Sequence, residues 1–275
     1  MLTILLATYN SSHYIRELLD SILAQTYKDW TLVIRDDVSS DNTVEIVNEY
    51  IAQYPGKFSL LDNHGESKRA YLNFVELMKN VESDYYMFCD HDDVWLPDKI
   101  ELSIKKMNEV EKDGVPAIVH TDMKVVNQNL QVIHDSFWVY SRLLPEHNSF
   151  VEMVLCNSAN GCTMLFNHKA KEVSLPNVEF AKMHDMLLNQ SVAANGGVIS
   201  PIYEATVLYR QHIDNVVGAK QRNFIYELKR FLNIPMFIKD NYDNWNCSRK
   251  IKKYSFAEYI WTKVKIMYYK IQLYK

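Results

Sequence analysis

The chain has 275 residues, 48% hydrophobic and 23% charged, which is an ordinary globular composition with enough length for a large core. It contains no apolar run of about 18 residues, and no basic segment precedes its short N-terminal apolar run, so we expect neither a membrane-spanning helix nor a signal peptide. Its four cysteines show no C-x-x-C spacing and nothing indicates a disulfide framework, so we expect buried thiols and a cytoplasmic protein.

Charge is unevenly distributed along the sequence. From Arg222 to Lys275 there are 12 Lys and Arg against 4 Asp and Glu, a net charge of +8. Because the whole chain carries −4, residues 1–221 carry −12. An acidic body followed by a basic tail predicts that the tail seeks an anionic surface.

Strand and helix patterns alternate over roughly the first 95 residues. Apolar runs predict buried parallel strands at residues 2–7, 30–34, 58–61 and 85–89. Apolar residues at helical spacing follow each of the first three strands, and a Pro-led helix follows the fourth. Polar loops follow the strand ends, so the pattern predicts a doubly wound α/β domain of the nucleotide-binding type.

The loops hold no glycine-rich phosphate-binding turn. The chain has only seven glycines, with neither G-x-G-x-x-G nor G-x-x-x-x-G-K-[ST], so backbone amides cannot cradle phosphates in the usual way. A diphosphate site here would need a metal. Asp37 could accept the N3–H of a uracil or thymine ring, and Tyr9 could lie against a base, although a strand-end Asp also commonly caps a helix.

Three carboxylates follow the fourth strand within four residues, in Asp90-His91-Asp92-Asp93. Residues two apart in an extended segment point the same way, so Asp90 and Asp92 can converge on one cation. Such oxygen ligands suit Mg²⁺ or Mn²⁺ together with substrate phosphates. The alternatives are a solvated acidic turn that caps the next helix, and a haloacid-dehalogenase-type phosphatase, in which D-x-D usually opens the chain.

As an ordered set, these motifs resemble the family 2 glycosyltransferases, and in particular the rhamnosyltransferase-like members, over about residues 1–220. The matching segments are Ala7-Thr8-Tyr9-Asn10, Asp36-Asp37-x-Ser39-Ser40-Asp41-x-Thr43, Asn63-x-Gly65 with Asn73, Asp90-x-Asp92-Asp93-x-Trp95-x-Pro97-x-Lys99, Asn160-Gly161-Cys162-Thr163-Met164-Leu165-Phe166, His184-Asp185, and Tyr209-Arg210-Gln211-His212-x-x-Asn215-x-x-Gly218. The sequence departs from the family at His184, where Glu is frequent.

The resemblance implies the GT-A fold, a mostly parallel doubly wound sheet with a helical C-terminal tail. Residues 1–222 would form the catalytic domain, with a nucleotide-sugar-binding half (1–100) and an acceptor-side half (101–222). Residues 223–275 would form a basic, aromatic helical tail.

The resemblance also implies an inverting, metal-dependent glycosyltransferase of cell-surface polysaccharide synthesis. It would move a sugar such as rhamnose from a UDP- or dTDP-linked donor to a hydroxyl of a saccharide or lipid-linked acceptor. Asp185 would be the general base, and Asp90, Asp92 and His212 would hold Mg²⁺ or Mn²⁺. The donor-binding residues would be Thr8, Tyr9, Asn10, Asp36, Asp37, Asp90, Asp92 and Asp93, with Lys68 or Arg69 at the diphosphate.

Two questions stay open at the level of sequence. The chain could instead be a non-catalytic nucleotide-sugar-binding subunit of a polysaccharide assembly complex. The tail, in which Tyr259, Trp261 and Tyr268 alternate with lysines, could lie on the inner leaflet of the membrane, pack on the catalytic domain, or join a homodimer. No nucleic-acid-binding module accompanies its charges, so we expect no nucleic-acid partner.

Overall fold

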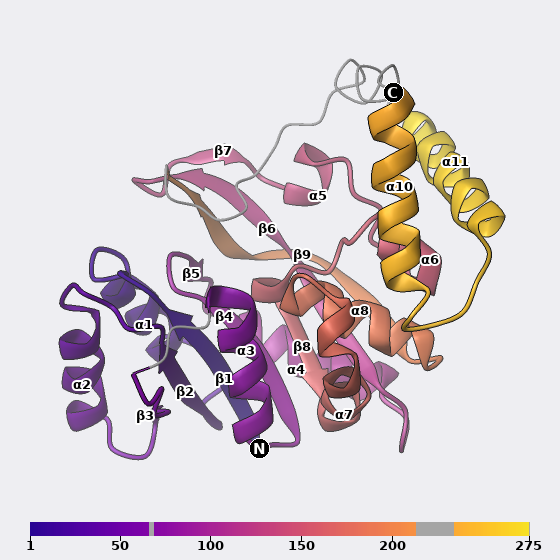
Figure 1. Cartoon of the computed structure of the whole chain (residues 1–275). Helices are drawn as coiled ribbons and strands as arrows, with labels where there is room; N and C mark the ends of the chain where they lie inside the picture. The colour runs from indigo at the N-terminus through magenta and orange to yellow at the C-terminus, as the bar shows by residue number, and fades with distance from the viewer. Residues whose placement is uncertain (66–68, 213–233, 275) are drawn as a thin grey trace.

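The computed structural model of the chain describes residues 1–65, 69–212 and 234–274, with the side chains of residues 234–238 left aside. The four predicted strands are present as β1 (Leu2–Thr8), β2 (Trp30–Asp36), β3 (Phe58–Leu60) and β4 (Tyr85–Asp90). They lie in the order β3-β2-β1-β4, and each neighbouring pair is parallel (Figure 1). The predicted alternation of buried parallel strands with helices in the first half of the chain is therefore confirmed.

Helices cover both faces of this sheet because the strand side chains are apolar on both faces. On one face Leu2, Ile4 and Leu6 belong to a buried cluster with the apolar sides of α1 (Ile15–Leu23), α2 (Thr43–Gln53) and α4 (Lys99–Val110). On the other face Leu5 and Ala7 pack with α3 (Arg69–Asn80). Alternation along a strand sends successive side chains to opposite faces, so both layers are held by the same short strands.

The second half of the sheet continues from β4 with mixed direction. Its strands are β5 (Val94–Trp95), β6 (Ala117–Asn127), β7 (Val132–His134), β8 (Met164–Asn167) and β9 (Val198–Gln211). The order continues β4-β8-β6-β9-β5, with β7 paired to β6, and β8 is antiparallel to both of its neighbours. The pairing of β9 with β5 returns the end of β9 to the loop that follows β4.

Short helices connect these strands. They are α5 (Phe137–Tyr140), α6 (Phe150–Leu155), the 3₁₀ helix η1 (Gly161–Thr163), α7 (His168–Ser174), the 3₁₀ helix η2 (Leu175–Phe180) and α8 (His184–Ala194). Helices α7 and α8 contribute Ala170, Leu187 and Leu188 to the same buried cluster as α3. The ring of His184, at the start of α8, lies 4.7 Å from that of Phe88 in β4, so the first turn of α8 packs near the end of β4.

Two helices end the described chain, α10 (Ile234–Ser248) and α11 (Phe256–Leu273), and both lie beside α6 and α8 (Figure 1). Tyr259 and Ile266 of α11 are 1% and 5% exposed, and Tyr259 packs with Trp245 in a separate apolar cluster. The inner side of α11 is therefore packed on the rest of the molecule. Trp261 and Tyr268 are 71% and 57% exposed, so the outer side remains bare. Residues 223–233 of the predicted tail lie outside the described residues.

Two expectations from composition can be compared with the structure. Within residues 1–65, 69–212 and 234–274, no helix has both the length and the apolar character required to cross a bilayer. All four cysteines are free thiols, as expected.

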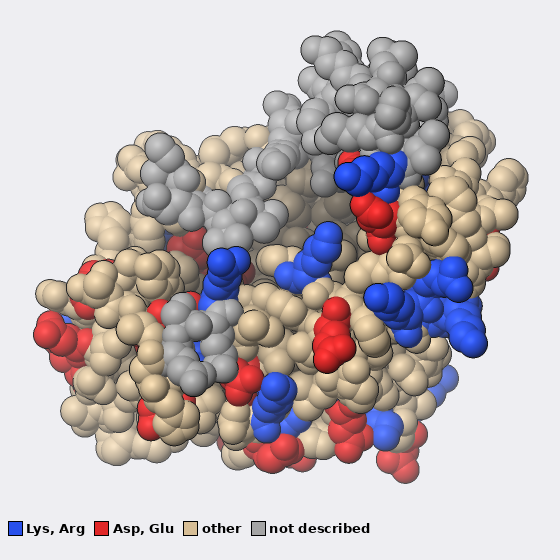
Figure 2. Space-filling view, viewed as in Figure 1, with Lys and Arg blue, Asp and Glu red and all other residues tan. Residues whose placement is uncertain are grey.

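Figure 2 shows Lys and Arg side chains gathered where Figure 1 draws the connection between α10 and α11. That connection carries the exposed residues Arg249, Lys250, Lys252 and Lys253, here called the basic turn.

Candidate active site

The ends of three parallel strands carry the predicted donor-side residues to one edge of the sheet. The register of β1 places Thr8 beside Asp36 of β2 and Ala7 beside Asp90 of β4. Ligands bind outside the carboxyl ends of strands in open α/β sheets. The edge formed by β1, β2 and β4 is therefore the expected ligand site.

Asp36 organises the loop that follows β2. Its carboxylate accepts hydrogen bonds from the Thr8 hydroxyl at 2.8 Å and from the main-chain N–H and hydroxyl of Ser39 at 2.7 and 2.6 Å. Its main-chain oxygen accepts a bond from the Asn63 amide at 2.9 Å. Because these donors occupy the carboxylate, Thr8 and Asp36 shape the site from within the fold.

Asn10 and Tyr9 form the rim of this site. Asn10 has a left-handed backbone (φ 45°), a conformation that Asn tolerates better than most residues. Its side-chain oxygen accepts a 2.8 Å bond from the Ser40 N–H, and its own N–H donates to the Ser39 hydroxyl at 2.9 Å. This clasp joins the loops after β1 and β2. Tyr9 lies next to it, 54% exposed, with its ring open to a planar ligand.

Asp37 is buried and already has partners. Its N–H donates to the Thr8 carbonyl at 2.8 Å, and one carboxylate oxygen accepts the N–H of Arg69 at 2.9 Å. The other oxygen lies 3.8 Å from the Arg35 guanidinium. Arg69 thus meets Asp37 through its main chain rather than its side chain. Lys68, the alternative diphosphate ligand, lies outside the described residues.

The carboxylates at the end of β4 and just after it are buried close together and repel one another. Burial, and then the charges of Asp92 and Asp185, raises the pKa of Asp90 to about 7. Burial and the charges of Asp92 and Asp90 raise the pKa of Asp93 well above its usual range. One oxygen of Asp93 accepts the Arg210 N–H at 3.1 Å, and the other has no hydrogen-bond partner among the described residues. A divalent cation would relieve this repulsion, so the oxygen-rich cluster fits Mg²⁺ or Mn²⁺.

The end of β9 closes over this cluster. The Arg210 guanidinium, which is 4% exposed, donates to the main-chain oxygen of Asp92 at 2.8 Å and pairs with Glu17 of α1. His212 follows two residues later, and its Nε2 lies 2.8 Å from Asp92 Oδ2 while its ring stacks on Tyr14 at 4.9 Å. The structure therefore brings His212 to the carboxylate that was predicted as a metal ligand.

A second set of three side chains, different from the predicted ligands, has donor atoms close enough together to bind one metal ion. Atoms of Asp90, Asp93 and Cys162 all lie within 4.8 Å of one another. Cys162 comes from η1, and sequence reasoning assigned it no role. Burial, and then the charges of Asp93 and Asp90, raises the pKa of its thiol well above its usual range. A protonated thiol is a poor ligand for a hard cation and a suitable neighbour for a carboxylate, so the oxygens of Asp90 and Asp93 are the better ligands of this trio.

Lys99 supplies positive charge beneath the cluster. It is fully buried, its ammonium lies 4.7 Å from the Trp95 ring, and it has no hydrogen-bond partner in the described part of the chain. Burial lowers its pKa to about 8, against the opposing effect of Cys162, Cys89 and Asp93. Lys99 therefore opposes the negative charge of Asp93 from inside the fold, at long range.

Asp185 stands in the first turn of α8, with both oxygens fixed. One accepts the Asn157 side-chain amide at 2.8 Å, and the other accepts the N–H of Met186 at 2.7 Å. The oxygen of Asn157 in turn accepts a 2.6 Å bond from Asn189, which is fully buried. Burial raises the pKa of Asp185 to about 6 despite these bonds. Its charge also raises the pKa of Asp90, so the two carboxylates are close enough to interact electrostatically.

His184 belongs to the core rather than to this space. Its ring lies 4.0 Å from that of Phe74 and 4.7 Å from that of Phe88, and burial lowers its pKa to about 3. Neither ring nitrogen has a hydrogen-bond partner in the described residues. A Cβ at Gly161 would lie 2.2 Å from Nε2 of His184, so glycine is required there. The neutral His184 thus packs α8 against the core. Of the two adjacent residues His184 and Asp185, only Asp185 carries a carboxylate.

Comparison with known proteins agrees with this geometry. The description "Glycosyl transferase family 2" matches residues 3–173. The chain belongs to this family. It is also 28% identical over 224 residues to the dTDP-rhamnosyl transferase RfbG of Shigella flexneri, a match that spans 78% of this chain and 74% of that protein. Because the chain belongs to a glycosyltransferase family, the phosphatase alternative is ruled out. Its D-x-D segment also begins at the end of the fourth strand, whereas in those phosphatases D-x-D usually opens the chain.

Solved structures share the fold at low identity. The chain resembles S. aureus TarS in complex with UDP-GlcNAc, with a TM-score of 0.59 and 18% identity over 85% of this chain and 65% of that one. It also resembles a Pyrobaculum calidifontis mannosyltransferase in complex with GDP-Man and Mn²⁺, with a TM-score of 0.53 and 13% identity over 99% of this chain and 75% of that one. These confirm the GT-A fold. The chain spans half or less of several other curated glycosyltransferases that it matches.

Proposed function

We propose that this family 2 glycosyltransferase is an inverting enzyme that transfers a sugar from a nucleoside diphosphate to an acceptor hydroxyl in cell-surface polysaccharide synthesis. The observation that carries the proposal is the proximity of two carboxylate sites. Asp90, Asp92 and Asp93 lie at the strand edge, and Asp185, whose own pKa is raised by burial, is close enough for its charge to raise the pKa of Asp90. A diphosphate site facing a general base is the arrangement that glycosyl transfer by single displacement requires.

The donor side would be built from the edge of β1 and β2. Tyr9 offers an exposed ring for a base, and Asp37, which directly follows β2 at the same edge, would accept the N3–H of uracil or thymine. Thr8, Asn10 and Asp36 hold the two loops in place. Arg69 is the described candidate for the diphosphate. The names of RfbG and of the TarS complex support a dTDP- or UDP-linked donor, with rhamnose as the sugar that the first suggests.

Asp90 and Asp92, with Asp93 in support and His212 beside Asp92, would hold Mg²⁺ or Mn²⁺. When bound, such a cation stabilises charge on the departing diphosphate as a Lewis acid. The Mn²⁺ named in the P. calidifontis complex, which shares the fold, supports a divalent metal as cofactor. The unpartnered oxygen of Asp93 and the mutual repulsion that raises the pKa of Asp90 fit a cluster that a bound cation would stabilise.

Asp185 would act on the acceptor. Its oxygens accept from Asn157 and Met186, which fixes the orientation of the carboxylate. The acceptor O–H gives its proton to Asp185, its oxygen bonds to the anomeric carbon, and the bond from that carbon to the diphosphate breaks. A carboxylate with a pKa near 6 keeps the proton better than an ordinary Asp, yet is mostly ionised at neutral pH.

The acceptor would be a saccharide or lipid-linked hydroxyl, met at the inner face of the membrane. The basic turn and the exposed Trp261 and Tyr268 of α11 support peripheral attachment, since basic and aromatic side chains bind anionic lipid surfaces. The free cysteines support a cytoplasmic setting. The proposed units are the catalytic domain, residues 1–222, and the helical tail from residue 223.

The test is a panel of sugar nucleotides. Binding is measured by calorimetry with Mn²⁺ and again with excess EDTA, and each donor that binds is offered to candidate acceptors with analysis of the product anomer. We expect one UDP- or dTDP-linked donor to bind in a metal-dependent way and to yield an inverted product. Binding of a donor without any transfer, to water or to an acceptor, would favour the non-catalytic nucleotide-sugar-binding subunit.

A further inference from the structure

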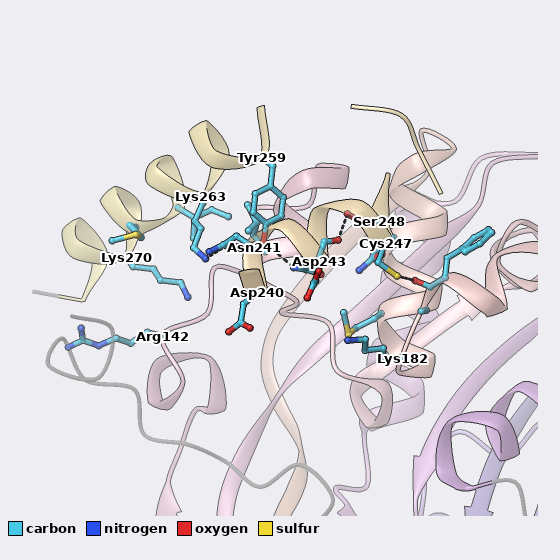
Figure 3. Close-up of a pocket in the computed structure, with 18 of the residues that line it drawn as sticks. Arg142, Lys182, Asp240, Asn241, Asp243, Cys247, Ser248, Tyr259, Lys263 and Lys270 are labelled. Atoms are coloured by element: carbon cyan, nitrogen blue, oxygen red, sulfur yellow. Dashed lines mark hydrogen bonds between the residues drawn. The ribbon is translucent and has the colours of Figure 1, made fainter. Parts of the chain in front are cut away.

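A cavity of about 500 Å³ lies between α10 and α11 on one side and α8 on the other (Figure 3). Its lining includes neither Asp185 nor any residue of the edge formed by β1, β2 and β4, so it is separate from the candidate active site. The contacts that hold the carboxylates of that site in place lie elsewhere, where the end of β9 meets α1 and the loop after β4.

The side chain of Arg210 joins the end of β9 to three other segments of the chain. Its Nε donates to the main-chain oxygen of Asp92 at 2.8 Å, and its Nη1 donates to the main-chain oxygen of Gln128, between β6 and β7, at 2.7 Å. Its Nη2 donates to the carboxylate of Glu17 on α1. Because a guanidinium is planar and carries its donors in a rigid fork, one side chain holds these three acceptors at fixed separations.

The main chain of Arg210 contacts the same carboxylate segment. Its N–H donates to Oδ1 of Asp93 at 3.1 Å, so one residue contacts both Asp92 and Asp93. The pairing of Val94 in β5 with Leu208 in β9 follows directly after these carboxylates. Arg210 and this strand pair together therefore set the position of Asp92 and Asp93 relative to β9.

Tyr14, in the residue before α1, connects Arg210 to His212. The guanidinium carbon of Arg210 lies 4.8 Å from the centre of the Tyr14 ring, and the His212 ring stacks on the Tyr14 ring at 4.9 Å. Nε2 of His212 lies 2.8 Å from Oδ2 of Asp92. Arg210 thus contacts Asp92 at its main chain and His212 contacts it at its side chain, while Tyr14 contacts both of them.

Contacts of this kind decide how well a metal site binds. Carboxylates that repel one another keep a ligand geometry only where other groups hold them in it. Groups that hold metal ligands without touching the metal are typically worth about 10- to 100-fold in metal affinity. The side chain of Arg210 is 4% exposed and is fixed by its three hydrogen bonds, so its position does not depend on the cation.

We propose that Arg210, supported by Tyr14 and Glu17, is a positioning residue for the cation site, and that it fixes Asp92 and Asp93 before the cation binds. This inference rests on the proposed function, because the cation is the one proposed for the diphosphate. Arg210 acts through the two carboxylate residues and is not itself a ligand. Tyr14 and Glu17 act one step further away, through Arg210 and His212.

The test measures Mn²⁺ binding rather than activity. Mn²⁺ is titrated into the full chain with and without UDP, and free Mn²⁺ is followed by electron paramagnetic resonance. Arg210→Gln should weaken Mn²⁺ binding by about 10- to 100-fold. Arg210→Lys should recover little of this, because an ammonium lacks the planar fork.

Two variants at the start of α1 test the same inference without altering the buried arginine. Tyr14→Leu and Glu17→Gln should each weaken Mn²⁺ binding by about threefold, since cation–π contacts and half-exposed ion pairs are individually weak. Tyr14→Phe keeps the ring face and should bind Mn²⁺ as the unmodified chain does. In the Arg210→Gln chain, Glu17→Gln should have no further effect, because Glu17 acts through Arg210.

Glu49→Gln is the matched control for Glu17→Gln. It breaks the 2.6 Å ion pair between Glu49 of α2 and Arg16 of α1, whose side chains are also half-exposed. This pair joins α1 to α2 rather than to β9, so Mn²⁺ binding should be unchanged. In Tyr14→Leu and Glu17→Gln, the Mn²⁺ concentration that half-activates transfer should rise with the Kd, and kcat at saturating Mn²⁺ should fall less than the affinity does. Their thermal unfolding midpoints without metal should match that of Glu49→Gln.

The outcomes separate this inference from the proposed function. Unchanged Mn²⁺ affinity in Tyr14→Leu and Glu17→Gln would overturn the inference and leave the function standing, and these two variants decide alone if Arg210→Gln does not fold. Equal weakening by Glu49→Gln, or a lowered unfolding midpoint that accounts for the loss, would show a merely structural role and overturn it as well. Sugar transfer by an unmodified chain that binds no Mn²⁺ would refute the cation site but not the transferase. An unmodified chain that binds Mn²⁺ yet neither binds nor transfers from any sugar nucleotide would count against the proposed function.

Discussion

Replacing Asp185 with Asn removes the proposed base with little change in shape. The wild-type carboxylate accepts from Asn157 and from the Met186 N–H, whereas an amide has one acceptor oxygen, so one of these bonds is lost at a cost of about 1 kcal/mol. The variant should therefore fold. Its kcat should fall by about 10²–10⁴, the usual weight of general base catalysis, which is about 3–5 kcal/mol of barrier.

Donor affinity should respond in the opposite direction. The charge of Asp185 is one of the causes that raise the pKa of Asp90. Removing it lowers that pKa, so Asp90 is more fully ionised near neutral pH and binds a cation at least as well. We expect the affinity for nucleoside diphosphate with Mn²⁺ to be unchanged or higher in Asp185→Asn.

The assay is the initial rate of transfer between pH 5 and 8, with calorimetry for donor binding. In the wild type the rate should fall about tenfold per pH unit below about pH 6, because Asp185 must be ionised to accept a proton. The residual rate of Asp185→Asn should lack this limb. Asp98→Asn, an exposed carboxylate at the start of α4, should behave as the wild type. Retained turnover with lost nucleotide binding would make Asp185 a donor ligand and refute the assignment.

Three further changes test the metal, the core and the tail. Asp92→Asn should abolish transfer and raise the Kd for nucleoside diphosphate with Mn²⁺ at least about tenfold without unfolding the protein, and a wild-type rate that is unchanged in excess EDTA would contradict this. Gly161→Ala should lower the free energy of unfolding by about 1–3 kcal/mol because its Cβ would meet His184, and a double variant with His184→Ala should recover part of this in chemical denaturation. Replacing the four cations of the basic turn with Gln should weaken sedimentation with anionic liposomes at low salt, by about 1 kcal/mol of binding free energy for each charge in reach of the surface. As a control, replacing Lys105, Lys106 and Lys112 with Gln should leave sedimentation unchanged. Equal sedimentation of both variants would show that the basic turn does not dock.

The donor side could be predicted from sequence because its signals are local. A parallel strand covered on both faces must be apolar along its length, and its end is marked where polar residues begin. Thr8, Asp36 and Asp90 stand at such ends, and the parallel order of three short βα units then fixes them at one edge. Local pattern and topology together suffice there.

The acceptor side depends on contacts between distant segments, and no local pattern encodes them. Asn157 donates to Asp185, which lies 28 residues later in the sequence. Asn189, further along α8, donates in turn to the oxygen of Asn157. Cys162 reaches Asp90 and Asp93 only because η1 precedes a strand antiparallel to β4. One feature of the sequence could have indicated that His184 is buried against Gly161. Histidine, whose ring can be neutral, stands there where the family often carries a charged Glu. A cavity between α8 and α11 requires the packing of the tail, which helical periodicity alone leaves open.

The two carboxylate sites should also be linked in their response to pH. Coulomb repulsion is mutual, so a cation that binds Asp90 and Asp92 lowers the cost of ionising Asp185. The acidic limb of kcat/KM reports the free enzyme and that of kcat the enzyme with donor and cation bound. The limb of kcat should therefore lie at lower pH than that of kcat/KM, and the separation should shrink in Asp90→Asn, which removes the carboxylate whose pKa responds to the charge of Asp185. Limbs at the same pH in the wild type would mean that the two sites do not share the space in which the sugar is transferred.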